Sequence, residues 1–536
     1  MPAELPRILL ALGSRRRLLA AAAGLGLFAL LFFGNAWVGD DAYITFRSVE
    51  QLFAGNGPRW NPHERVQAFT HPLWFGVLAV FRIASRDVFL NAVIASFLCS
   101  ALALVVLGRF FAFSGRWLLC VLMLCVSRSF VDYSSSGLEN PLSFLLAALF
   151  VASVLDGRLR EPRAAPQATR SVAWFAFLLA LALCNRHDFA PLLVPPTAYV
   201  AWRSRSIGRW RVAGALLVGL APFLLWTLFS LAYYGFPFPN TACAKLKTGI
   251  PVTDLVRQGV AYLWSDLRWD PITPGAILLA IVLGASRREG VFRAIGLGLL
   301  LHVLYVLRVG GDFMHGRMWT VAFFLAVPVI LEMLKGAPKA LLALGVACLI
   351  AVAIEPNAPL RMAEGRIRPY MDSHGIGDER AYYFGTSSLR QWLRWDPRRD
   401  GPVFPRHEWA FEGARLAQDR EAAGVVARAI GYLGYWAGTD RRIIDALGLA
   451  DPLLARLPCE HPWRIGHFER RLPDGYIESV ANNCNVLADP RLARFYGKLR
   501  LITQGPLGSA ERLRTLVAMN LGLYDSHLES YVRSHY

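Results

Sequence analysis

Two adjacent carboxylates, Asp40 and Asp41, stand where a long uncharged run (residues 18–39) ends in the sequence GDDAYITFR. Adjacent like charges repel each other, so the pair needs a functional or structural reason. A carboxylate can accept a proton from an attacking hydroxyl group, or it can bind a divalent cation. The pair therefore predicts a site that accepts a proton or binds a cation. A simple helix cap remains open.

Four further polar motifs interrupt the apolar stretches: SSSGLENP (134–141), NRHDF (185–189), PFPNTACAK (237–245) and RVGGDFMHGR (308–317). Ionisable groups at the edge of a membrane are costly unless they pair or face water, so they suggest a site. Lysine and arginine suit a phosphate leaving group. We therefore expect one cavity lined by acids and cations, suited to a phosphate-bearing donor. The alternative is that each acid caps a helix or pairs with a neighbouring arginine.

The predicted site residues fall into two groups. The cations expected to bind the donor phosphate are Lys245, Arg317, Arg308 and Arg47. The residues expected to contact the substrates are Glu139, Arg186, His187, Asp188, Asn240, Asp312, His63, Glu64 and His71. Arg47 can alternatively pair with Glu50, and an isolated histidine is often structural. A divalent metal is possible near His187 and His315, because imidazole and carboxylate ligands suit several such ions; no cofactor is certain.

The composition is that of a membrane protein. The 536 residues are 55% hydrophobic and 18% charged, and their mean hydropathy is +0.36. The formal net charge of +18 could suggest a nucleic-acid partner. However, most basic residues in the first two thirds of the chain lie in short clusters between apolar runs, which is typical of cytoplasmic loops. Nucleic acid is therefore not an expected partner.

The apolar runs predict the topology. A spanning helix needs about 20 apolar residues, and the basic clusters at 202–211 and 286–290 are expected on the cytoplasmic side. Counting the runs gives about 11 spans, with the amino terminus inside and the carboxyl terminus outside. This count makes one of three runs between residues 72 and 127 re-entrant or interfacial. The expected fold is thus a polytopic α-helical membrane domain (1–355) followed by a soluble extracytoplasmic α/β domain (356–536).

Cys459 and Cys484 are the only cysteines in the predicted soluble domain. If that domain lies outside the cytoplasm, a disulfide between them is expected. It would close a loop of about 25 residues and contribute roughly 3 kcal/mol of stability. Two buried thiols are the alternative.

Several motifs resemble one family. GDDAYITFR and the later GNGPRWNPHERVQAFTHPLW resemble the first extracytoplasmic loop of polytopic glycosyltransferases of the C superfamily (GT-C). SGLENPL, NRHDF, PNTACAK and GGDFMHGR resemble motifs of one branch, the lipid-linked arabinofuranosyltransferases. This branch includes the terminal arabinofuranosyltransferase of mycobacterial arabinan and the pilin arabinosyltransferase of pseudomonads. IIDALGLADPLLARLP and GHFERRLPDGYIES, near the carboxyl terminus, resemble the same branch.

The resemblance implies a polyprenyl-phosphate donor and the transfer of its sugar, D-arabinofuranose, to an extracytoplasmic acceptor at a bacterial inner membrane. It also implies that one acid of the pair activates the acceptor as a base or binds a metal. We expect Asp41 to be this base, buried toward the donor, with Asp40 supporting it, and the reverse assignment stays open. The acceptor stays open between a pilin serine or threonine and a glycan end. The implied partners are the lipid-linked donor, this protein or glycan acceptor, and the lipid bilayer. A transporter or flippase of a lipid-linked sugar and a non-catalytic surface-assembly protein are the alternatives. The acids lie at one membrane edge, whereas transporters place their sites near mid-membrane, which favours the enzyme.

Overall fold

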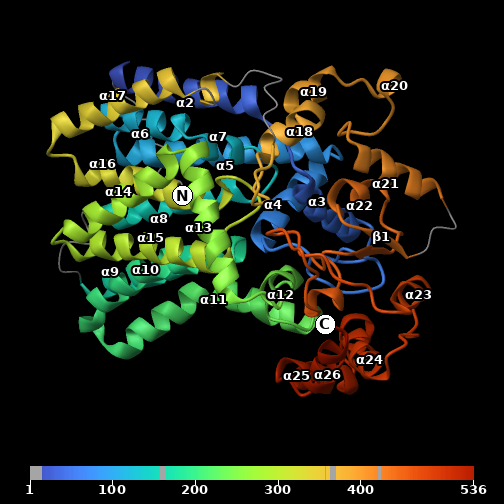
Figure 1. Ribbon diagram of the computed structural model, residues 1–536. Coiled ribbons are helices and arrows are strands. Elements are labelled where there is room, and N and C mark those ends of the chain that lie inside the picture. Colours follow the sequence, from blue (N-terminus) through green and yellow to red (C-terminus); the bar gives the residue numbers. More distant parts are fainter. Residues whose placement is uncertain (1–14, 157–163, 356–357, 362–369, 420–423) are drawn as a thin grey trace. The chain divides into compact units, whose positions relative to one another are not determined.

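The computed structural model describes residues 15–156, 164–355, 358–361, 370–419 and 424–536, and helices form most of this part (Figure 1). The described residues divide into two compact units, each built from segments far apart in the sequence. The first unit comprises residues up to Val38, Phe89–Phe223 and Val256–Arg390. The second unit comprises Gly39–Val88, Leu224–Leu255 and Gln391–Tyr536. The two units therefore interleave along the chain. The predicted boundary at residue 355 separates a membrane domain from a soluble domain, and it stays a prediction.

The long helices of the first unit coincide with the apolar runs of the sequence. They are α2 (Arg15–Asn35), α5 (Val88–Phe110), α6 (Gly115–Val126), α8 (Asn140–Leu155), α9 (Ala165–Asn185), α10 (Ala190–Arg203), α14 (Ile272–Ser286), α15 (Gly290–Val309), α16 (Thr320–Met333) and α17 (Pro338–Ile354). Two helices have residues in both units: α11 (Arg209–Tyr233) and α13 (Val252–Trp269). The short elements are α7 (Arg128–Tyr133), η2 (His187–Phe189), η3 (Arg205–Ile207), η4 (Arg317–Trp319), η5 (Pro359–Arg361), α18 (Glu379–Ser387) and α19 (Leu389–Arg394).

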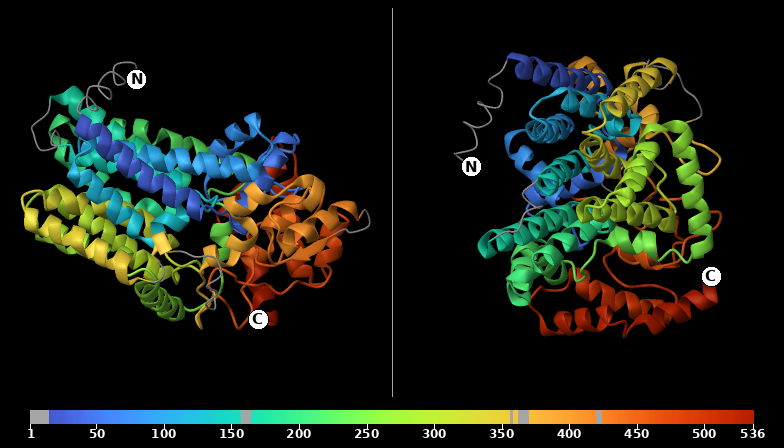
Figure 2. Two further views of the ribbon diagram at one scale, coloured as in Figure 1. Left: turned by 90° about the horizontal axis from the view of Figure 1, so that it is seen from above. Right: turned by 90° about the vertical axis from the view of Figure 1, so that its left-hand side faces the viewer.

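Helix α16 is the centre of the first unit, because every one of its residues is buried. It packs against α8 and α14. Helix α15 packs against both α14 and α10. Figure 2 shows these helices from two further directions. Glycines bring the backbones close together. A Cβ atom built on Gly298 of α15 would lie 2.3 Å from the Leu192 carbonyl oxygen of α10. Small residues at such crossings are typical of helix packing in membranes.

Several helices have the length of a membrane span, as the sequence predicted. Five described helices, α2, α5, α9, α11 and α15, are long and apolar enough to cross a membrane. A sixth span results if α13 and α14, which meet at a bend of 111°, are counted as one. Shorter apolar helices are α4 (Pro72–Ala84), α6, α8 and α17. The count of about 11 spans stays a prediction.

The second unit is also mainly helical. Its elements are α3 (Asp40–Phe53), α4, α12 (Asn240–Leu246), α20 (Pro397–Asp400), α21 (Glu408–Gln418), α22 (Gly431–Trp436), η6 (Leu454–Arg456), α23 (Tyr476–Ala481), α24 (Pro490–Gln504), α25 (Ala510–Asn520), α26 (Asp525–His535) and two strands. Strand β1 (Val425–Ala427) pairs in parallel with β2 (Ile443–Asp445). Among the described residues after 355, this pair of three-residue strands is the only sheet that the expected α/β domain contains.

The structure has Cys459 and Cys484 as free cysteines in place of the predicted disulfide. Cys459 is buried, and its backbone N–H donates to the Thr248 carbonyl oxygen (2.9 Å). Cys484 is half-buried beyond α23, where its thiol donates to the Glu478 carbonyl oxygen (3.9 Å). Different segments therefore hold the two thiols, and the spacing of the cysteines in the sequence could not reveal this.

Gly298→Ala is expected to destabilise the first unit, because the new Cβ atom would overlap a backbone oxygen that has no freedom to rotate away. Overpacking costs about 1–3 kcal/mol, so the melting temperature in detergent should fall by several degrees in a size-exclusion thermal-shift assay. Gly275→Ala in α14 is the matched control, because no heavy atom lies within 4 Å of its Cβ position. Equal melting temperatures for the two variants would contradict the close approach of α15 and α10.

Candidate functional site

The acidic pair begins a helix and does not lie on an extended strand. Asp40 and Asp41 are the first two residues of α3, where acids are favourable because they face the positive end of the helix dipole. Successive residues of a helix are rotated by about 100°, so the two carboxylates diverge. Asp40 is buried at 6% exposure and Asp41 is half-buried. Asp40 is thus the more buried acid, opposite to the expected order, because it packs against α22. The role of Asp41 as a base stays a prediction.

The Asp40 carboxylate bonds to the first turn of α22. Its two oxygens accept the backbone N–H groups of Gly431 (3.1 Å) and Tyr432 (2.6 Å). The helices touch so closely that a Cβ atom on Gly431 would lie 1.9 Å from the Asp40 carbonyl oxygen. Burial raises the pKa of Asp40 to about 7, and the charge of Asp41 adds to this effect, whereas the two N–H groups oppose it. Asp40 thus acts as a positioning residue that joins α3 to α22.

Arg47 is buried two turns along the same helix and bonds only to backbone oxygens among its described hydrogen-bond partners. It donates to the carbonyl groups of Trp60 (3.0 Å), Gly434 and Arg441 (2.7 Å). Its guanidinium also lies over the Trp60 ring, 4.3 Å from the ring centre. Glu50, its alternative partner, pairs with Arg82 (2.6 Å). The predicted phosphate contact of Arg47 would therefore require these backbone bonds to break.

The segment after α3 places Glu64 in the interior of the second unit. Asn61 Nδ2 donates to the Glu64 carboxylate (3.2 Å), and His63 Nε2 lies 3.7 Å from the same oxygen. Burial raises the pKa of Glu64, and the nearby Asp451 carboxylate adds to the shift. Burial also lowers the pKa of His63 to about 3, so this histidine is neutral. His71 instead packs against α3, with Nε2 2.7 Å from the Thr45 hydroxyl group.

Two buried acids of the C-terminal part, Asp445 and Asp451, were not singled out from the sequence. Asp445 accepts the N–H groups of Leu447 and Ala450, at 2.9 and 2.8 Å. Asp451 accepts the Tyr476 hydroxyl group (2.8 Å) and two backbone N–H groups. The spacing of two aspartates around a glycine-containing turn, in IIDALGLAD, was the available signal. Both acids hold this turn in place.

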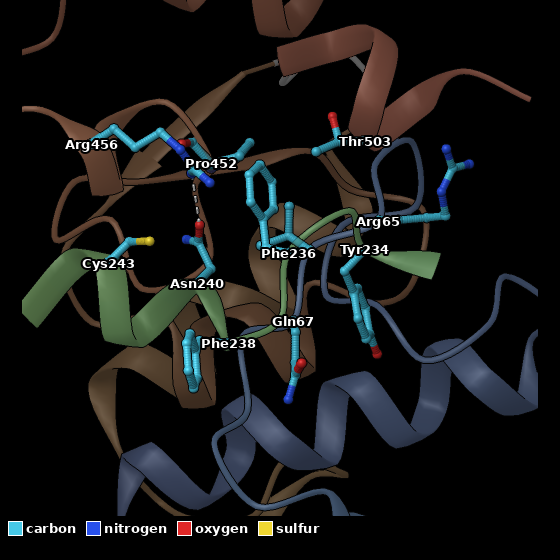
Figure 3. Close-up of a pocket in the computed structure, with 11 residues that line it drawn as sticks. Arg65, Gln67, Tyr234, Phe236, Phe238, Asn240, Cys243, Pro452, Arg456 and Thr503 are labelled. Atoms are coloured by element: carbon cyan, nitrogen blue, oxygen red, sulfur yellow. Dashed lines mark hydrogen bonds between the residues drawn. The ribbon is translucent and has the colours of Figure 1, made fainter. Parts of the chain in front are cut away.

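Asn240 belongs to the same turn structure. Its amide donates to the carbonyl oxygens of Gly448 (2.9 Å), Leu449 (3.1 Å) and Asp451 (3.0 Å), and its oxygen accepts Arg456 Nη1 (3.3 Å). Figure 3 shows Asn240 and Arg456 beside Phe236 and Cys243 in a cavity of about 10 Å³. Such a volume holds about one water molecule. Asn240 therefore orders the protein chain at this position, and the cavity is too small for a sugar.

Lys245 and Arg308 are the accessible members of the predicted cation set. Lys245 is exposed near the end of α12, and Arg308 is exposed in the last turn of α15. They belong to different compact units.

The first unit brings five predicted residues into one charged cluster, which comprises Glu139, Arg186, Asp188, Asp312 and Arg317. Arg186 donates to Glu139 (2.7 Å) and, through Nε, to Asp188 (2.8 Å). Arg317 lies 3.5 Å from the Glu139 carboxylate and 3.6 Å from that of Asp312. Residues from three separate sequence motifs thus lie together. The hypothesis of one charged cavity required this of these five residues. The structure does not place this cluster relative to Asp40, Asp41 or Lys245.

The histidines near this cluster have other neighbours. His187 packs its ring against Phe223, with 5.7 Å between the ring centres. His315 Nδ1 lies 2.7 Å from Asp266, whose other oxygen accepts the Trp319 indole N–H (2.7 Å). Among the described residues, no group of three or more histidines, cysteines and acids is arranged to hold a metal ion.

An open groove of about 480 Å³ lies in the second unit at the carboxyl ends of β1 and β2. Its walls include Trp409 and Glu412 from one side of α21, and the ion pair of Arg428 with Glu469 (2.7 Å). Leu433 and Leu472 give it apolar surface. The carboxyl edge of parallel strands is the usual place for a ligand in such sheets. A mixed apolar and polar lining of this volume suits a small organic ligand.

Asp40→Asn is expected to lower stability, because the amide nitrogen cannot accept a backbone N–H; losing such a buried bond costs about 1–3 kcal/mol. The raised pKa also predicts a pH dependence. Asp40 contributes stability at low pH that is lost as the pH rises through about 7. The melting temperature should therefore fall between acidic and mildly alkaline pH, and it should fall less in the variant. An identical pH profile in both proteins would contradict the burial of this acid.

No family model matches this chain. Two curated relatives are similar to it, and both are named terminal beta-(1->2)-arabinofuranosyltransferase. The protein from Mycobacterium tuberculosis is 27% identical over 533 residues, which cover 82% of this chain and 82% of the relative. The protein from Corynebacterium glutamicum is 30% identical over 356 residues, which cover 57% of this chain and 49% of the relative. The similarity confirms the resemblance to GT-C arabinofuranosyltransferases that the sequence motifs indicated.

Proposed function

We propose that this chain is a membrane glycosyltransferase that moves a D-arabinofuranosyl group from a polyprenyl-phosphate donor to an acceptor outside a bacterial inner membrane. The similarity to two arabinofuranosyltransferases carries the proposal. The acceptor is a glycan end or a pilin hydroxyl group. The part of the chain after residue 355 lies on the extracytoplasmic side.

The chemistry requires a base more than an acid. The bond between the anomeric carbon and the phosphate oxygen breaks, and the polyprenyl phosphate leaves as an anion that needs little protonation. An acceptor hydroxyl oxygen bonds to the anomeric carbon, and its proton moves to a carboxylate. Asp41 is assigned this role because it is half-buried at the start of α3, whereas the Asp40 oxygens both bond to α22. The proton then passes from Asp41 to water.

Arg317 is the proposed contact of the donor phosphate within the first unit. Its ion-pair distances of 3.5 and 3.6 Å exceed the 2.7 Å between Arg186 and Glu139. A close charge-assisted bond measures about 2.7–2.9 Å, so these two ion pairs of Arg317 are longer than the bond between Arg186 and Glu139. A phosphate oxygen can therefore compete for its guanidinium group. Lys245 in the second unit and Arg308 in the first are exposed, and each is proposed to attract anionic headgroups at the surface of its own unit.

The groove beside β1 is the proposed contact for the acceptor glycan in the second unit. An indole ring offers an apolar face, and carboxylates accept hydrogen bonds from hydroxyl groups. Trp409 and Glu412 supply both on neighbouring turns of α21. The arginine of the groove is paired with Glu469, so the groove does not favour an anionic ligand. These features favour a neutral, hydroxyl-rich chain.

Asp41→Asn is expected to abolish most transfer while the protein still folds, because the amide keeps the size of the side chain and removes its basicity. Loss of a general base lowers the rate by about 10²- to 10⁴-fold. The assay uses purified protein in liposomes, a synthetic polyprenyl-phosphoryl arabinofuranose donor and an arabinofuranosyl acceptor, with the product measured by mass spectrometry. Asp41→Glu is the control that retains a carboxylate and should retain part of the activity. More than about a tenth of wild-type transfer by Asp41→Asn would exclude the role. Donor translocation without any transfer by the wild-type protein would instead indicate a flippase.

Glu412→Gln is expected to weaken acceptor use and leave donor use unchanged. Loss of one hydrogen bond to a charged group in an open groove should raise the acceptor KM by about 2- to 10-fold. Glu529→Gln is the matched control, because Glu529 is an exposed glutamate on α26 that does not line the groove. An unchanged acceptor KM in Glu412→Gln, with a normal melting temperature, would contradict acceptor binding in the groove.

A further inference from the structure

Helix α25 has an apolar face on each side. Its inner face carries Leu516 and Met519, which pack in the core cluster around α24. Its outer face carries Leu513, Val517 and Leu521, spaced by four residues and so aligned along one side of the helix. The second apolar face needs an explanation, because a surface helix of a soluble domain normally presents polar residues to water.

The outer face is strongly exposed. Leu513 is 48% exposed, Val517 is 55% exposed and Leu521, directly after the helix, is 70% exposed. Leu507 and Leu523, in the segments that flank α25, are also exposed, at 46% and 68%. A single exposed leucine needs no explanation, but a continuous apolar row marks a surface that another partner covers.

The neighbouring helix shows that this pattern is specific to α25. Helix α26 packs on the same α24, as Figure 1 also shows, yet its exposed positions are polar. They include Ser526, Glu529 and Arg533. Two helices of one bundle therefore present different chemistry to their surroundings, and only α25 has an apolar outer row.

Two hydrogen bonds fix α25 at the end of α11. Arg512 Nη2 donates to the Tyr233 carbonyl oxygen (3.0 Å), and Asn520 Nδ2 donates to the Gly235 carbonyl oxygen (2.8 Å). These bonds lie near both ends of α25, so the whole helix is held there. Gly235 has a positive φ of 91° and no room for a side chain, because a Cβ atom would lie 2.1 Å from Ile502 of α24.

Helix α11 has the properties of a membrane span. It is 25 residues long and apolar, and only 11% of its most apolar window is buried within the protein. Leu225 and Leu228, in its second half, are exposed. The helix ends at Tyr233, which is half-buried, and tyrosines concentrate where a span leaves the bilayer. A span that ends at Tyr233 would bring its end to the membrane surface, and α25 is bound to that end.

We propose that α25 is an interfacial helix whose outer row, Leu513, Val517 and Leu521, binds the surface of the lipid bilayer. A helix in this position lies parallel to the membrane, with its apolar residues at the boundary of headgroups and acyl chains. Arg514 is exposed beside Leu513 and can meet the lipid phosphates. The bilayer is favoured over a protein partner because the helix that carries the apolar row is bonded to the end of a candidate membrane span. The second unit thus has a contact with lipid in addition to α11.

Site-specific photocrosslinking in proteoliposomes tests this placement. A benzophenone amino acid is introduced singly at Val517 or Leu521, and the full chain is reconstituted in phosphatidylethanolamine and phosphatidylglycerol vesicles. Ultraviolet light should then give a phospholipid adduct on α25, detected by mass spectrometry of the digested protein. The positions Glu529 and Arg533 on α26 are the controls and should give at least tenfold less adduct. Leu225 on α11 is the positive control for lipid contact.

The alternative occupants give different products. A covalent dimer in place of the lipid adduct would identify a second copy of the chain as the partner and overturn the proposal. No adduct at Val517 and Leu521, with a clear adduct at Leu225, would also overturn it, because the row would then face water. Proteins that elute as a single species before reconstitution show that the substitutions have not unfolded the chain. A phospholipid adduct at Val517 and at Leu521 supports the proposal.

Discussion

The buried carboxylate of Asp40 is the interaction on which the arrangement of the second unit depends. It accepts the backbone N–H groups of Gly431 and Tyr432, which lie 391 and 392 positions further along the chain. Arg47, on the same helix, donates to backbone carbonyl groups of the same distant region, including that of Gly434. Helix α3 therefore provides hydrogen-bond partners for both kinds of α22 backbone group: Asp40 accepts N–H groups, and Arg47 donates to a carbonyl oxygen. Because the partners are backbone atoms, side-chain changes on α22 cannot create or replace these bonds, and Gly431 leaves no room for a larger residue.

The predicted polar residues differ in what they bond to and in how exposed they are. Asp40, Arg47 and Asn240 bond to backbone groups of distant segments. Asp41, Lys245 and Arg308 are half-buried or exposed. A group that exchanges protons with a substrate, or attracts one, must reach the substrate. The second set is therefore where the proposed chemistry is assigned, although both sets come from the same motifs.

Much of this arrangement could be predicted from the sequence, and the failures have physical causes. The apolar runs correspond to helices because their length and composition suffice to define them. The meeting of Glu139, Arg186 and Arg317 followed from the cost of isolated charges in an apolar protein. The helical start at Asp40, the carbonyl partners of Arg47 and the separate thiols of Cys459 and Cys484 could not be predicted. Each depends on a partner hundreds of residues away or on local chain geometry, and neither has a signal in composition or spacing.

The interleaved second unit imposes an order on folding. Its first segment, Gly39–Val88, is synthesised early, but the segment that completes its interior, Gln391–Tyr536, is synthesised last. Contacts between residues so far apart form slowly, because the closure of a long loop must precede them. During synthesis, Asp40 and Arg47 therefore remain without these partners until the segment that contains α22 has been made. A chain truncated before α22 would leave both charges without these bonds.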